Sequence, residues 1–121
     1  MGVRMDLKIN INTYKIIIVD ENDNNLKMED GCYHFGVCDM KNKIIYLMRN
    51  LPKDSLFYTI KHELTHAYID SYGFLQVDYT DEIIADFIAS YIINIEKDYQ
   101  KILKYYKQED KKWKNNKTMK E

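Results

Sequence analysis

The sequence predicts an α+β fold in which a small antiparallel sheet packs against two helices. Three observations predict it. Runs rich in β-branched and aromatic residues fill the N-terminal part, an apolar stripe with helical spacing begins after residue 53, and a second helical pattern follows residue 80. With 121 residues, 45% apolar and 31% charged, the chain is long enough for one globular domain. We expect that domain to span residues 1–113, followed by a disordered basic tail over residues 114–121.

The sheet is predicted from three segments. Residues 13–20 (TYKIIIVD) have the β-branched and aromatic density of a strand, and a turn-rich loop follows them. Residues 32–39 (CYHFGVCD) and 43–50 (KIIYLMRN) are strand-like runs on either side of a short MKN connection. We therefore expect a β-hairpin beside an N-terminal strand.

The first helix is predicted over residues 54–72. Pro52, the only proline, suits the entrance of a helix, and Gly73 suits the C-terminal cap. The predicted inward-facing residues recur at intervals of three and four positions: Leu56, Ile60, Leu64 and Ala67.

A second, long helix is predicted from about residue 81. Thr80 is a suitable N-cap, and Asp81 and Glu82 lie in the first turn, where the helix dipole favours acids. The first half of this helix is apolar almost all round, so we expect it to run through the core, whereas the second half has a one-sided apolar stripe. The apolar residues of the first half include Ile83, Ile84, Phe87, Ile88 and Ile92.

Composition argues against several classes of protein. We find no apolar run of membrane-spanning length and no signal-peptide pattern, so we expect a cytoplasmic protein without membrane partners. Cys32 and Cys38 lie too far apart on one extended strand to form a disulfide. Residues 101–121 carry eight basic and three acidic side chains, which we interpret as the solvated end of a helix rather than a nucleic-acid-binding surface. A DNA-associated protein with a structural zinc is the alternative that this basic end leaves open.

The segment HELTH, residues 62–66, carries the chemistry. Residues four apart share one face of a helix, so His62 and His66 can direct both imidazoles at one metal ion. Glu63 then lies close enough to act as a general base on a water molecule, as in the H-E-x-x-H pattern of zinc peptidases. The alternative is a helix with two incidental histidines, which this composition makes rare.

A catalytic zinc ion usually has three protein ligands. Glu82 and Asp86 are also four apart on a helix that is otherwise apolar, and buried carboxylates need a positive partner. We expect Glu82 to be the third ligand and Asp86 to orient a ligand histidine from outside the metal's own ligand set. Rival third ligands are His34, Asp78, Asp81 and Asp86, and possible donors to the substrate or its oxyanion are Tyr72, Tyr79 and His34.

The segments HELTHAYIDSYG and DEIIADFIASYI resemble the compact gluzincin peptidases of the ImmA/IrrE kind, especially the short versions in phages and mobile elements. The resemblance covers about residues 32 to 95. It implies a minimal zincin-like fold and a zinc metallo-endopeptidase in a bacterial host cell. His62, His66 and Glu82 match the family's zinc ligands, Glu63 the catalytic base and Asp86 the supporting acid.

The resemblance also implies a protein or peptide substrate, such as a transcriptional regulator. The chain departs from longer members because it has no helix-turn-helix module, which leaves the substrate open. The edge of the hairpin around residues 36–39 could hold an extended peptide by strand addition. The alternative function is a binding protein that keeps this fold but acts by contact with a host or phage regulator. The oligomeric state stays open.

Overall fold

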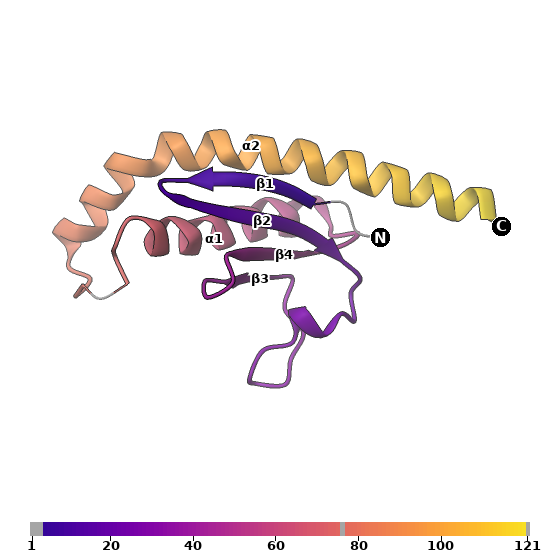
Figure 1. The fold of residues 1–121 in the computed structure, drawn as a ribbon, viewed down its shortest axis with the longest axis horizontal. Coiled ribbons are helices and arrows are strands. Elements are labelled where there is room, and N and C mark those ends of the chain that lie inside the picture. Colours follow the sequence, from indigo (N-terminus) through magenta and orange to yellow (C-terminus); the bar gives the residue numbers. More distant parts are fainter. Residues whose placement is uncertain (1–3, 76, 121) are drawn as a thin grey trace.

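The computed structural model describes residues 4–75 and 77–120, and it has the expected α+β class. The strands are β1 (Arg4–Ile9), β2 (Asn12–Val19), β3 (Gly36–Asp39) and β4 (Ile44–Met48). The helices are the short 3-10 helix η1 (Asn24–Leu26), α1 (Lys53–Ser71) and α2 (Asp81–Lys120). Figure 1 shows α2 running the length of the molecule above the sheet, with α1 beside it. In the described part of the chain, no helix meets the length and apolarity that crossing a membrane requires.

The sheet is mixed, which corrects the prediction of an antiparallel sheet. Its strand order is β1-β2-β4-β3, and β2 pairs with β4 in parallel, with Ile17 opposite Tyr46. The predicted hairpin is present as β3 and β4, but its second strand inserts between β2 and β3. The reason is that β4 (IIYLM) is continuously apolar, a pattern typical of a central strand, whereas β3 (GVCD) is short and partly polar.

The sequence interpretation missed strand β1. Its residues RMDLKI alternate between polar and apolar side chains, and it forms an antiparallel hairpin with β2. The turn between them uses Asn10 at a φ of 55°, a left-handed conformation that asparagine tolerates better than most residues. Leu7 and Ile9 are buried, so β1 completes one side of the core.

The ends of the helices agree closely with the sequence prediction. Pro52 immediately precedes α1, and Gly73 follows it at a φ of 81°, which lets the chain turn away from the helix. Thr80 caps α2, because its Oγ1 accepts a hydrogen bond from the Ile83 amide at 3.3 Å. The backbone of α2 continues through residues 114–120, where we expected a disordered tail, and residue 121 lies outside the described residues.

The core lies between the sheet and the two helices. The fully buried apolar residues of α2 begin at Tyr99, while Phe87, Tyr91 and Ile95 are only partly buried against the core. Ile102 is fully buried, and the Tyr106 hydroxyl donates to the Met48 carbonyl (2.6 Å) and accepts from the Leu51 amide (3.0 Å). The first half of α2, by contrast, does not run through the core as predicted. The residues that show this are Ile84, Ile88, Ile92 and Ile93, each between 45% and 66% exposed.

Candidate metal centre

The two histidines of α1 converge on one point. The Nε2 atoms of His62 and His66 are 3.2 Å apart, and their ring planes meet at 76°. Two nitrogens that each lie 2.0–2.1 Å from a tetrahedral zinc ion are about 3.3 Å apart. The pair therefore has the spacing that a single metal ion would require of two ligands.

Tyr58 extends this face by one more helical turn. Its ring stacks on that of His62, with centroids 5.4 Å apart and an interplanar angle of 28°. Tyr58 itself is 69% exposed, so its stacking orients the imidazole without burying it. The sequence contained this signal, because residues 58, 62 and 66 follow the same four-residue spacing.

Glu63 is the buried member of the cluster. Its carboxylate lies with the histidine nitrogens in a group whose ligand atoms are all within 4.8 Å of one another, and the residue is only 7% exposed. Burial raises the pKa of Glu63 to about 7, against opposing effects of a hydrogen bond from the Cys38 amide and the charge of His34. A carboxyl group with a pKa near neutrality can both accept and return a proton.

Gly36 allows Glu63 to lie against the sheet. A Cβ at Gly36 would meet Thr59 Cγ2 at 2.6 Å and Glu63 Cγ at 3.1 Å, so α1 crosses β3 in contact with its backbone. Any larger residue at position 36 would push the helix, and with it the histidine pair, away from the strand.

Strand β3 is the edge of the sheet nearest to this cluster. The Met48 amide donates to the Phe35 carbonyl at 2.8 Å, and bonded pairs alternate with non-bonded pairs along an antiparallel ladder. Gly36 and Cys38 therefore direct their amide and carbonyl groups towards the open edge. The Cys38 amide already donates a hydrogen bond to the Glu63 carboxylate, and this bond links the edge strand to the cluster.

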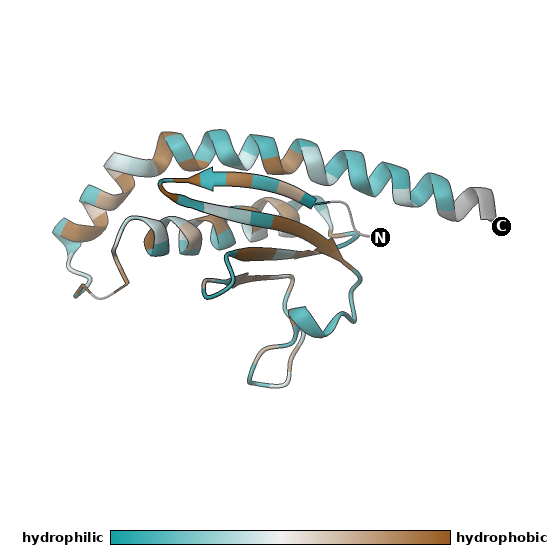
Figure 2. Ribbon diagram, viewed as in Figure 1, coloured by the Kyte–Doolittle hydropathy of each residue, from teal (hydrophilic) through white to brown (hydrophobic). Residues whose placement is uncertain are grey.

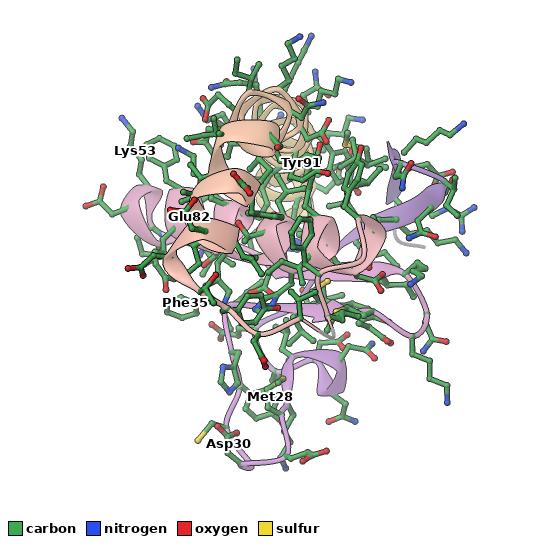
Figure 3. All side chains as sticks on the ribbon, turned by 90° about the vertical axis from the view of Figure 1, so that its left-hand side faces the viewer. Met28, Asp30, Phe35, Lys53, Glu82 and Tyr91 are labelled. Atoms are coloured by element: carbon green, nitrogen blue, oxygen red, sulfur yellow. The ribbon has the colours of Figure 1, made fainter. Side chains whose placement is uncertain are left out.

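The structure does not bring Glu82 and Asp86 into the cluster; among the described residues, only His62, Glu63 and His66 form it. Both acids are exposed on the first turns of α2, and Figure 3 shows Glu82 on that helix, well above the segment with Phe35. Ile84, Ile88 and Ile92 line the space between α2 and α1. At about 100° per residue, Glu82 and Asp86 then lie on the other side of α2.

The remaining sequence candidates have other partners. His34 pairs with Asp30 at 3.2 Å in the exposed loop before β3, close enough to Glu63 to stabilise its charge. Tyr72 packs against the ring of Tyr91, with centroids 4.3 Å apart. The remaining rivals, Asp78 and Asp81, are exposed and outside the cluster.

Tyr79 has a local role. Its hydroxyl donates to the Phe74 carbonyl at 2.9 Å, which closes the connection between the two helices.

Comparison of the chain with protein-family models, with curated proteins and with solved structures gives no match.

Proposed function

We propose that the protein is a zinc-dependent metallo-endopeptidase in which His62 and His66 bind the metal and Glu63 is the general base. The single observation that supports this most is the 3.2 Å separation of the two Nε2 atoms, with the Glu63 carboxylate in the same group. Helical spacing brings the two histidines together, and the buried Glu63 beside them supplies the acid–base group that a zinc peptidase needs.

A zinc ion bound there would lower the pKa of a coordinated water and polarise a peptide carbonyl. Glu63 would act as the general base, taking a proton from the attacking water and passing it to the leaving amine. The open edge of β3 would align an extended substrate through the backbone groups of Gly36 and Cys38. Substrate binding at this edge would also compete with Glu63 for the Cys38 amide, which would free the base.

Glu82 stays our proposal for the third ligand. Because it lies outside the cluster and on the other side of α2, the first turns of α2 would have to rotate before Glu82 could join the histidines. His34, already held by Asp30, is the rival that needs no change in α2.

The position of Glu82 also favours a second candidate function, a binding protein that acts by contact. Two histidines without a third ligand hold zinc weakly, and such a protein would need no general base. We keep this as the alternative to cleavage.

Metal analysis and single variants separate these possibilities. The wild type, dialysed against micromolar zinc, should retain about one equivalent, and His62→Ala should retain none. Glu63→Gln should retain the zinc while losing any metal-dependent cleavage of an unfolded reporter protein. Retention of zinc by His62→Ala would refute the metal site, whereas a Glu63→Gln protein with full biological effect would establish the contact function.

The third ligand is tested by comparing Glu82→Ala with His34→Ala. Loss of a protein ligand should weaken zinc binding by at least about tenfold. If only His34→Ala weakens zinc binding, the third ligand is His34, in the loop before β3, rather than Glu82 of α2.

A further inference from the structure

A groove between α1 and the first half of α2 has no role in the metal centre. Its volume is about 540 Å³, and aliphatic and aromatic side chains form most of its wall. We call it the α1–α2 groove and define it by the residues that the argument uses: Lys61, Thr65, Phe74, Ile84, Ile88 and Ile92.

The isoleucines with which α2 forms one wall of the groove are exposed, and we call Ile84, Ile88 and Ile92 the isoleucine ridge. They are 45%, 49% and 55% exposed, and Figure 2 shows hydrophobic bands along this half of α2. A cluster of large aliphatic residues exposed together is typical of a protein interaction surface rather than of a free helix.

The polar side chains at the groove already have hydrogen-bond or ion-pair partners within the chain. Thr65 Oγ1 donates to the Lys61 carbonyl at 2.7 Å, and Lys61 Nζ pairs with Glu96 at 3.4 Å. The Tyr79 hydroxyl is bonded to Phe74. Small-molecule sites normally present a few converging polar groups, and here each of these three groups has a partner within the chain.

The charge around the groove selects among macromolecular partners. Residues 62–96 contain seven acidic side chains and no lysine or arginine. Asp78, Asp81 and Glu96 are exposed acids within two residues of the groove-lining Tyr79, Ile83 and Ile95, whereas Glu82 and Asp86 lie on the other side of α2. A symmetric contact between two copies would set these acids against each other, and an anionic membrane would be repelled, whereas a basic partner would be attracted.

We propose that the α1–α2 groove binds an amphipathic helix of a partner protein, with an aliphatic face flanked by lysine or arginine. The aliphatic face fills the groove and covers the isoleucine ridge, and the basic flanks meet the acidic rim. This inference does not depend on the metal centre, because none of the residues that line the groove belongs to the His62, Glu63 and His66 cluster.

The test uses two designed helical peptides with the same leucine and isoleucine face. One has lysine on both flanks, the other glutamate, and binding to the full chain is followed by fluorescence anisotropy. The lysine peptide should bind at least about tenfold more tightly than the glutamate peptide, and the difference should shrink at high salt.

Two substitutions locate the binding surface. Ile88→Asp should weaken binding of the lysine peptide by at least about tenfold, while Ile11→Asp, at an isoleucine 85% exposed in the β1–β2 turn, should leave it within about twofold. Both residues are exposed, and circular dichroism checks that each variant folds. Because zinc binding should be unchanged in Ile88→Asp, failure of this proposal is distinguishable from failure of the metal site.

Several results would overturn the proposal. Equal binding of the two peptides would show that the partner need not be basic. An equal loss of binding in Ile88→Asp and Ile11→Asp would show that the peptide does not bind in the α1–α2 groove. Sedimentation should find a monomer. A dimer that Ile88→Asp dissociates would instead make a second copy of the chain the occupant.

Discussion

The burial of the two halves of α2 is the reverse of what their apolar content suggests. The first half is the more apolar, yet Ile88 and Ile92 are about half exposed. The second half is rich in lysine, yet Ile102 and Tyr106 are almost completely buried against the sheet. Hydrophobic spacing therefore identifies which face of a helix seeks a partner, but not whether the same chain supplies one.

The largest effect should come from truncating matched isoleucines in the two halves. Ile102→Ala should lower the free energy of unfolding by roughly 2–5 kcal/mol, because it leaves a cavity in the core. Ile88→Ala should lower it by less than about 1 kcal/mol, because this side chain is already half exposed. Urea denaturation of both variants makes the measurement. Similar losses would show that the first half of α2 is as firmly packed as the second.

Replacing Glu63, the acid of the metal cluster, should stabilise the protein, whereas replacing a buried residue usually destabilises it. Burial raises the pKa of Glu63 to about 7 from its ordinary value near 4.5, so the folded state holds the proton more tightly than the unfolded state. Its ionisation therefore lowers stability as the pH rises from about 4.5 to about 7. With a chelator present, Glu63→Gln should be more stable than the wild type by roughly 1–3 kcal/mol at pH 8 and about equal to it near pH 4.5.

The control for that prediction lies in the exposed half of α2. Glu82→Gln should change stability by less than about 0.5 kcal/mol at either pH, because exposed substitutions away from packed groups have small effects. Thermal melts at the two pH values give both comparisons. A Glu63→Gln protein less stable at pH 8 than the wild type would contradict the burial of an unneutralised carboxyl group.

The junction of the two halves depends on a buried acid. Asp98 is 7% exposed and accepts a hydrogen bond from the Tyr68 hydroxyl of α1, and burial and this bond both raise the pKa of Tyr68. Tyr68→Phe leaves Asp98 without that donor and should cost about 1–3 kcal/mol. Asp98→Asn in the same background should recover part of the loss, because an amide is cheaper to bury than a carboxylate. No recovery in a double-mutant cycle would show that the two residues are not coupled.

Local patterns predicted the parts of the fold and site that depend on a single element. The spacing of His62 and His66 on one helix is enough to bring their nitrogens together, and Thr80 and Gly73 mark helix ends by their own chemistry. Parallel pairing of β2 with β4 was not predictable in this way, because it depends on which strand enters between two others. The place of Glu82 depends on the rotation of α2 against α1, which the sequence of α2 alone does not determine.

A small effect should come from the ion pair beside the α1–α2 groove. Lys61 Nζ lies 3.4 Å from Glu96, and both side chains are about half exposed. Lys61→Ala should therefore change the free energy of unfolding by less than about 1 kcal/mol. The same change frees Glu96 at the groove, so it should strengthen binding of the lysine-flanked peptide by a few-fold at low salt. Weaker binding, measured by anisotropy at two salt concentrations, would mean that Lys61 contributes packing to the groove that outweighs its charge.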